Sequence, residues 1–337
     1  MTSTADPHGT YLGVDGGGTK TALVLLDSTG DVLASALAPS CYYLGRSIRL
    51  VEDVLSEGVG AISAQSGVAP AEVTRAFFAL PGYGEVSADV SLLDEIPGRV
   101  LGHSRYSCNN DMVAGWAGSL GAVDGVNVIA GTGSMTYGEH GPHRLRVGGW
   151  GELFDDEGSA YWIAIRGLAA FARMSDGRLP PGPLHDTLTE HLGLATDLDL
   201  VDVVLNRWQG DRSRIAALAR TVAAAAMAGD SECRTILRHA GEALADLVTA
   251  TIDQLDFTAD EPVPVSWSGG VFSSPEVGDA FRAQLDGTGV DLREPLLPPV
   301  LGAALYAARV TGSPLDAGAI ERLQTYASTV PQGGPDE

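Results

Sequence analysis

The chain has 337 residues, enough for two domains, and 45% of them are hydrophobic, an ordinary share for a globular protein. Its formal net charge of −22 argues against a nucleic-acid or anionic-membrane partner, because both would repel it at long range. The first residues, MTSTADPHGT, lack the basic and apolar regions of a signal peptide, and no apolar run reaches the roughly 18 residues of a membrane span. We therefore expect a cytoplasmic protein.

The first patterned segment, YLGVDGGGTKTALVLLD at residues 11–27, predicts a β-hairpin with a glycine turn. Its spacing fits neither a P-loop nor a G-x-G-x-x-G dinucleotide fingerprint. Lys20, the only lysine among 21 Lys and Arg residues, lies in this turn. Backbone N–H groups, a hydroxyl and an ammonium converge there and predict a phosphate site, with a plain tight turn as the alternative. The residues concerned are Gly17, Gly18, Thr19 and Lys20.

The next elements alternate between helix and strand. A third strand begins at Val32, residues 46–66 carry apolar positions at helical spacing, and residues 74–80 form a strand-like run that ends in Pro81-Gly82. A polar cluster, NND at residues 109–111, then leads into a helix of small residues. Asp111 is therefore a candidate general base or, alternatively, a helix N-cap.

The hairpin pattern occurs a second time about one hundred residues later. Residues 126–130 form a strand that runs into Gly131-Thr132-Gly133-Ser134, and a second strand follows over 135–138. This repetition predicts two related halves. A third turn of small residues, Ser268-Gly269-Gly270, follows the strand-like residues 263–267.

A long helical region separates the second and third turns. We expect helices over residues 160–174, 198–208, 214–227 and 233–255, an exposed loop over 175–186, and a final helix over 300–309 behind two prolines. The three cysteines, Cys41, Cys108 and Cys233, have no metal-ligand spacing.

Five motifs together resemble those of a known family. DGGGTKT at 15–21, NND at 109–111, AGTGS at 130–134, GGWGELFDDEGSAYWIA at 148–164 and SGG at 268–270 occur in the order found in N-acetylglucosamine kinases. These belong to the benzoyl-CoA reductase activator-type ATPases of the sugar kinase, actin and heat-shock chaperone superfamily. GGWG followed by DEGSAYW is the most specific part, because it is typical of the sugar kinase branch, and the paired cysteines of the iron-sulfur activators are absent.

The resemblance implies an α/β fold of two ribonuclease H-like, actin-like ATPase domains with a cleft between them. We expect residues 1–115 to form the first domain and residues 116–330 a larger second domain with a helical insertion. A return of the helix near 300–312 to the first domain is left open, as is a homodimer.

The resemblance also implies a site that uses ATP and Mg²⁺. Asp111 matches the family's catalytic base, and Asp15 matches the acidic residue that holds Mg²⁺, through water. The expected nucleotide-binding residues are Gly17, Gly18, Thr19, Lys20, Thr132, Gly133, Ser134, Gly269 and Gly270. The expected substrate-binding residues are Cys41, Gly82, Asn110, Asp111, Gly149, Trp150 and Asp156.

Alternatives remain for parts of this site and for the function. The acidic residues 155–157 precede a helix and could stabilise its positive end. Cys41 occupies a position where the family carries an asparagine, and the turn at residues 79–85 lacks the usual small residues. We expect transfer of the γ-phosphoryl group of ATP to the C6 hydroxyl of N-acetylglucosamine. The alternatives are glucosamine or another hexose as acceptor, and an ATPase switch without a sugar acceptor.

Overall fold

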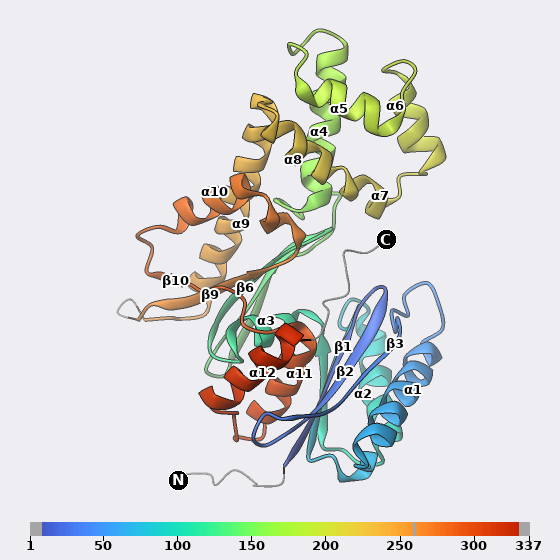
Figure 1. The fold of residues 1–337 in the computed structure, drawn as a ribbon, viewed down its shortest axis with the longest axis vertical. Helices are drawn as coiled ribbons and strands as arrows, with labels where there is room; N and C mark the ends of the chain where they lie inside the picture. The colour runs from blue at the N-terminus through green and yellow to red at the C-terminus, as the bar shows by residue number, and fades with distance from the viewer. Residues whose placement is uncertain (1–8, 259–260, 330–337) are drawn as a thin grey trace. The chain divides into compact units, whose positions relative to one another are not determined.

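The computed structural model describes residues 9–258 and 261–329, which divide into two compact units (Figure 1). Unit 1 contains the described residues up to Val123 and those from Glu294 onward, and unit 2 spans Asp124–Arg293. The boundary expected between residues 115 and 116 falls inside helix α3 (Met112–Leu120), and the structure divides the chain three residues after that helix ends. The helix over residues 299–309 belongs to unit 1.

Unit 1 is built on a five-stranded sheet with the order β3-β2-β1-β4-β5. The predicted hairpin is confirmed: β1 and β2 pair antiparallel from Thr10↔Asp27 to Gly16↔Thr21. β3 is antiparallel to β2, whereas β4 is parallel to both β1 and β5. The strands are β1 (Thr10–Gly16), β2 (Lys20–Asp27), β3 (Val32–Pro39), β4 (Arg75–Leu80) and β5 (Tyr106–Asn110).

Helices cover both faces of this sheet, because its central strands alternate between two apolar clusters. Leu23 and Leu25 of β2 pack into a cluster with α1 and α2, whereas Val24 and Leu26 face a cluster with α11 and α12. The helices are α1 (Arg49–Ser66), α2 (Val90–Leu101), α3, α11 (Pro299–Arg309) and α12 (Ala317–Thr329), with 3₁₀ turns at Pro70–Glu72 and Ser87–Asp89.

Glycines allow the backbone of α11 to pack directly against the backbones of β1 and α3. A Cβ on Gly13 of β1 would overlap the backbone of Ala304, and a Cβ on Gly302 would overlap the backbone of Gly118 in α3. These contacts pack α11 closely against α3, which begins two residues after β5 ends.

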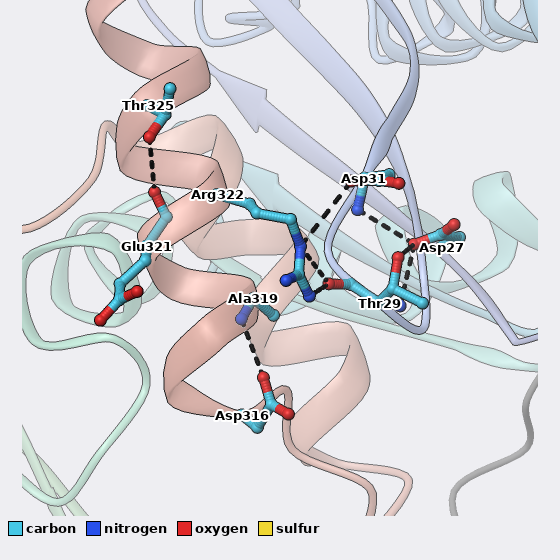
Figure 2. Close-up of polar contacts among 8 residues, drawn as sticks. All are labelled: Asp27, Thr29, Asp31, Asp316, Ala319, Glu321, Arg322 and Thr325. Carbon is cyan, nitrogen blue, oxygen red and sulfur yellow. Dashed lines mark hydrogen bonds and ion pairs between the residues drawn. The ribbon is translucent and has the colours of Figure 1, made fainter.

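Helix α12 is attached to the turn between β2 and β3 (Figure 2). Arg322 donates from Nε to the carbonyl oxygen of Thr29 at 3.0 Å and from Nη2 to the same oxygen, and its Nε lies 3.7 Å from Oδ1 of Asp31. Asp27 orders the same turn by accepting hydrogen bonds from the backbone N–H groups of Thr29 and Asp31. The sequence patterns did not predict α12.

Unit 2 repeats the sheet of unit 1, which confirms the prediction of two related halves. Its order is β10-β9-β6-β7-β8, and β6, β7 and β8 pair antiparallel in succession while β9 is parallel to both β6 and β10. β6 therefore corresponds to β1 and β7 to β2. The strands are β6 (Gly125–Ala130), β7 (Ser134–His140), β8 (His143–Gly148), β9 (Val263–Ser268) and β10 (Val290–Leu292).

The helices of unit 2 include an insertion between β8 and α9, and Figure 1 shows α5 and α6 lying away from the sheet. The loop expected over 175–186 ends earlier, because Pro183 and its neighbours open a helix, as proline at a first helical position allows. The helix expected over 198–208 is one α turn followed by a π-helix. The helices are α4 (Ala160–Ser175), α5 (Pro183–Leu192), α6 (Asp199–Val201), the π-helix Asp202–Arg207, α7 (Arg212–Ala217), α8 (Ala219–Met227), α9 (Ser231–Gln254), the 3₁₀ turn Gly270–Ser273 and α10 (Pro275–Leu285).

The close approach of α11 and α3 predicts opposite effects for two Gly→Ala changes in helices. Gly302→Ala adds a methyl group against backbone atoms of α3 that cannot move away, so we expect a loss of about 2–4 kcal/mol in the free energy of unfolding. Gly60→Ala in α1 has open space around its Cβ and should gain about 0.5–1 kcal/mol. Urea unfolding of both variants tests this, and equal effects would contradict the packing.

Candidate functional site

Two carboxylates lie at the same edge of the unit 1 sheet. Asp15 is next to last in β1 and is paired with Ala79 of β4, which in turn is paired with Asn109 of β5. β1, β4 and β5 run parallel, so their carboxyl ends meet at one edge. Asp111 follows β5 directly, and the strand register thus brings Asp15 and Asp111 together.

Asp111 does not act as a side-chain cap of α3. It lies at the N-cap position with helical backbone angles (φ −61°, ψ −24°), and its side chain makes no capping hydrogen bond. The N–H of Met112 instead donates to Oδ1 of Asn110 at 3.2 Å. Asn110 is 6% exposed, and its amide also donates to the carbonyl oxygen of Tyr83 at 3.3 Å. Asn110 is therefore used by the fold, whereas the Asp111 carboxylate is available for chemistry.

Both carboxylates are harder to ionise than free aspartate. Burial raises the pKa of Asp15 to about 7, and the nearby Asp111 adds to the increase while Lys20 opposes it. Burial also raises the pKa of Asp111; the N–H groups of Asp111 and Met112 oppose this shift, and the carboxylate of Glu85 adds to it. Paired acidic groups with raised pKa values are typical of functional sites.

The first glycine turn is short and closed by the N–H of Gly17, which donates to the carbonyl oxygen of Lys20 at 2.8 Å. Gly16 is required for packing, since a Cβ there would lie 2.5 Å from Sγ of Cys41 and 2.7 Å from Cδ of Pro81. Gly18 has open space around it, and Thr19 and Lys20 are exposed. The turn thus presents backbone, hydroxyl and ammonium donors to solvent.

Cys41 lies in the hydrophobic core rather than at the surface. It is 1% exposed and belongs to the same apolar cluster as Leu12 and Val14. Burial also raises the pKa of its thiol. The exposed part of this loop is Tyr42, whose N–H donates to the Ser40 hydroxyl at 3.1 Å. A ligand contact with Cys41 would therefore require the loop to open.

Gly82 lies at the carboxyl end of β4 with φ +77°, a conformation that favours glycine. A Cβ there would be 3.2 Å from Leu44 and 3.6 Å from Cε2 of Tyr42. Tyr83 donates its hydroxyl to Oδ1 of Asp94 at 2.9 Å, which ties the following turn to α2.

The second glycine turn, in unit 2, is joined to the start of α4. Ala160 and Tyr161 donate their N–H groups to the carbonyl oxygens of Gly131 and Thr132, at 2.8 and 3.4 Å. Ser134 is buried, and its hydroxyl donates to the carbonyl oxygen of Glu157 at 2.6 Å. Ser134 therefore holds the turn in place, while Thr132 is the exposed residue of the turn.

The loop after β8 presents an exposed aromatic side chain. Gly149 has φ +74°, and Trp150 is 73% exposed, with its N–H donating to Oδ2 of Asp155 at 2.8 Å. The N-cap of α4 is Ser159, whose hydroxyl accepts from the N–H of Trp162. Ser159 rather than Asp155 or Asp156 therefore caps α4.

Asp156 is 2% exposed and adopts φ +58°, which is uncommon for a residue other than glycine. Its Oδ2 accepts a hydrogen bond from Nη2 of Arg212 at 2.5 Å, and Nε of Arg212 lies 3.2 Å from Oε2 of Glu152. Both groups lie against Gly133, where a Cβ would be 2.6 Å from Nη2 of Arg212 and 2.8 Å from Oδ2 of Asp156. Sequence reasoning missed Arg212, because it lies 56 residues from Asp156 and in no motif.

The third turn lies against the second. Gly269 has φ +99°, and a Cβ on it would overlap the backbone of Ala130, the last residue of β6. Gly269 and Gly270 are exposed. Unit 2 therefore brings together its turns at residues 131–134 and 268–270.

Two sheets of the same order, each with a glycine turn between its central antiparallel strands, define an α/β protein of the actin-like ATPase class. The chain belongs to the BadF/BadG/BcrA/BcrD ATPase family, which matches residues 12–307. The family and fold expected from the five motifs are thereby confirmed.

Two relatives of this chain are named as sugar kinases. N-acetyl-D-glucosamine kinase of Dictyostelium discoideum is 32% identical over 274 residues, which cover 77% of this chain and 84% of the relative. N-acetylmuramic acid/N-acetylglucosamine kinase of Clostridium acetobutylicum is 29% identical over 282 residues, which cover 82% and 90% of the two chains.

Solved structures of related proteins have a similar fold. A Chromobacterium violaceum protein assigned as an N-acetylglucosamine kinase has a TM-score of 0.65 and 27% identity, covering 89% of this chain and 99% of that one. The ROK hexokinase of Thermus thermophilus, at 16% identity, shares the fold with a TM-score of 0.58 and covers 90% and 99%. Among the described helices, none has the length and apolar character needed to cross a membrane.

The raised pKa of Asp15 predicts a pH-dependent cost to stability. An ionised Asp15 is disfavoured only in the folded protein, so its cost grows from about pH 4 up to about pH 7. Asp15→Asn removes the charge and should raise the free energy of unfolding more at pH 8 than at pH 5. The difference should be about 2.5–3 kcal/mol, because the cost grows by about 1.4 kcal/mol per pH unit between pH 5 and about pH 7. Urea unfolding with EDTA present measures this, with Asp53→Asn on the exposed side of α1 as the control. An equal gain at both pH values would contradict the assignment.

Proposed function

We propose that the protein is a cytoplasmic kinase that transfers the γ-phosphoryl group of ATP to the C6 hydroxyl of N-acetylglucosamine. The observation that carries this proposal is the Asp111 carboxylate, which lies beside Asp15 at the end of the parallel strands and is not used as a helix cap. The names and coverage of the curated relatives support the acceptor class.

Phosphoryl transfer to an alcohol needs a group that orients the hydroxyl and accepts its proton. Asp111 has the chemistry for this role, and its raised pKa makes it a better proton acceptor than a solvated aspartate. The neighbouring Asn110 side chain binds the N–H of Met112 at the start of α3 and the carbonyl oxygen of Tyr83, whereas the N–H groups of Asp111 and Met112 lie beside the Asp111 carboxylate and favour its ionised form.

The carboxylate pair also fits Mg²⁺. Mg²⁺ usually binds through one or two carboxylates together with phosphates and water, and Asp15 supplies such an oxygen donor. A divalent cation would compensate the repulsion between Asp15 and Asp111, which raises the pKa of Asp15 in the metal-free protein. When bound, Mg²⁺ neutralises charge on the phosphates.

We assign nucleotide binding to the glycine turns. In unit 1, Gly17, Gly18, Thr19 and Lys20 offer donors for phosphate oxygens. In unit 2, Thr132 and Gly133 offer backbone N–H groups and a hydroxyl, and the Ser134 hydroxyl holds their turn against the loop before α4. Gly269 and Gly270 present an exposed backbone without side chains, against which an adenosine ring can lie.

We assign sugar binding to Gly82, Asn110 and Asp111 in unit 1 and to Gly149, Trp150 and Asp156 in unit 2. The exposed Trp150 ring can stack on the apolar face of a sugar. Cys41 supports its loop from the core, so Tyr42 and Ser40 are the residues of that loop that can reach a ligand.

Removing the proton acceptor tests the assignment of the base. In Asp111→Asn the shape is kept, and we expect kcat with N-acetylglucosamine to fall by about 10² to 10⁴ while the Kd for ATP changes little. ADP release is measured across N-acetylglucosamine, glucosamine and glucose, with Asp53→Asn as the control. A kinase shows release that depends on the sugar, whereas an ATPase switch releases ADP at the same rate without one. Retention of most of the kcat in Asp111→Asn would refute the role of this residue.

The second glycine turn offers a matched pair of substitutions. Gly133→Ala places a methyl group against Arg212 and Asp156, whereas Gly131→Ala meets nothing within 4 Å. We expect the Kd for ATP to rise at least about tenfold in Gly133→Ala and to change less than about threefold in Gly131→Ala, since one phosphate contact is worth about 1.4 kcal/mol or more. Titration calorimetry measures both, and equal affinities would count against a phosphate site at this turn.

A further inference from the structure

Arg212 and Asp156 form an ion pair, of which only Asp156 belongs to one of the five sequence motifs. Asp156 belongs to the loop after β8, whereas Arg212 is the first residue of α7 in the helical insertion. The Asp156 side chain is 3% exposed and the Arg212 side chain 42% exposed. The guanidinium therefore contacts a buried carboxylate while part of the Arg212 side chain remains open to solvent.

A buried carboxylate needs compensation to remain ionised. Burial raises the pKa of Asp156 and the neighbouring Asp155 adds to this, while Arg212 and the backbone N–H groups of Ser134 and Gly151 oppose it. Glu152 and Glu157 are the further charged groups on the same loop, and Oε2 of Glu152 lies 3.2 Å from Nε of Arg212. The turn at residues 131–134, against which the pair packs, carries no ionisable side chain.

The geometry makes Arg212 well suited to hold the carboxylate in one orientation. Its planar guanidinium uses two different nitrogens, with Nε directed to Glu152 and Nη2 to Asp156. The contact between Glu152 and Arg212 fixes the guanidinium even when another donor reaches Asp156. The left-handed backbone of Asp156 and the absence of a side chain on Gly133 leave room for this arrangement.

We propose that Arg212 is a positioning residue: its guanidinium keeps the Asp156 carboxylate ionised and oriented against the second glycine turn, where Asp156 accepts hydrogen bonds from sugar hydroxyls. This inference rests on the proposed function for its second half, the contact with the sugar. An ionised carboxylate accepts hydrogen bonds with all of its lone pairs, whereas a protonated one donates through one oxygen and binds hydroxyls less well.

Titration of Asp156 tests the first half without any assay of activity. In protein labelled with ¹³C at the aspartate carboxyl groups, the Asp156 resonance is identified by its loss in Asp156→Asn. We expect its titration midpoint to rise by about 1–3 pH units in Arg212→Met, the range for loss of a close opposite charge. Arg212→Lys should restore most of the wild-type midpoint. Arg214→Met removes the same charge from the same helix away from the pair and should leave the midpoint unchanged.

The dependence of activity on pH tests the second half. In Arg212→Met, the KM for N-acetylglucosamine should be raised about tenfold at one pH unit below the shifted Asp156 midpoint, where about a tenth of the carboxylate is ionised, and should recover toward the wild-type value above that midpoint, with kcat less affected. Adding Arg212→Met to Asp156→Asn should produce no further pH dependence of KM, because the carboxylate on which Arg212 acts has been removed.

The outcomes separate the two halves. An unchanged Asp156 midpoint in folded Arg212→Met would overturn the proposal, and a shifted midpoint with a pH-independent KM would overturn the link to sugar binding. Absence of sugar phosphorylation in the wild type would refute the proposed function, while the midpoint would still decide the role of Arg212. If Arg212→Met does not fold, Arg212→Gln, which keeps an amide donor without the charge, is titrated in its place.

Discussion

In each unit the candidate residues depend on glycine at the turn between two antiparallel strands, because only the absence of a side chain lets other groups pack against the backbone there. In unit 1, Gly16 leaves space for Cys41 and Pro81, which support the loops around Asp15. In unit 2, Gly133 leaves space for Arg212 and Asp156. A single methyl group at either position would displace the neighbours that define the site.

The two units use the same sheet order for different chemistry. The next-to-last residue of β1 is Asp15, which lies beside Asp111, and burial raises the pKa of both carboxylates. β6 ends in Ala130, and the charge near its turn comes instead from Asp156 and from Arg212 of the helical insertion. The repeated scaffold therefore places two neighbouring carboxylates, Asp15 and Asp111, at the sheet edge of unit 1 and a buried carboxylate paired with an arginine beside the glycine turn of unit 2.

The hairpins, their glycine turns and the position of Asp111 could be predicted from the sequence because each is encoded locally, by alternation, by glycine and by a polar group at the start of a helix. The role of Arg212 could not be predicted, since its partners Asp156 and Glu152 are 56 and 60 residues away in the sequence. An arginine in a helical segment of ordinary pattern gives no sign of which carboxylates it binds. The burial of Cys41 was also unpredictable, because a short loop such as PSCYYLG has no period that shows which side chain faces inward. Helix α5 begins inside the segment that was expected to be a loop. The prolines there were ambiguous, because proline breaks a helix in its interior but favours one at its first position.

The central claim is that the γ-phosphoryl group of ATP goes to a sugar hydroxyl rather than to water, and its destination can be measured directly. The protein is incubated with Mg²⁺, N-acetylglucosamine and ATP that carries ¹⁸O in the γ-phosphoryl group, and the products are analysed by mass spectrometry. The account predicts a sugar phosphate that retains the labelled phosphoryl oxygens, formed in equal amount to ADP, and its disappearance in Asp111→Asn. Label found only in inorganic phosphate, at a rate indifferent to the sugar, would contradict the account.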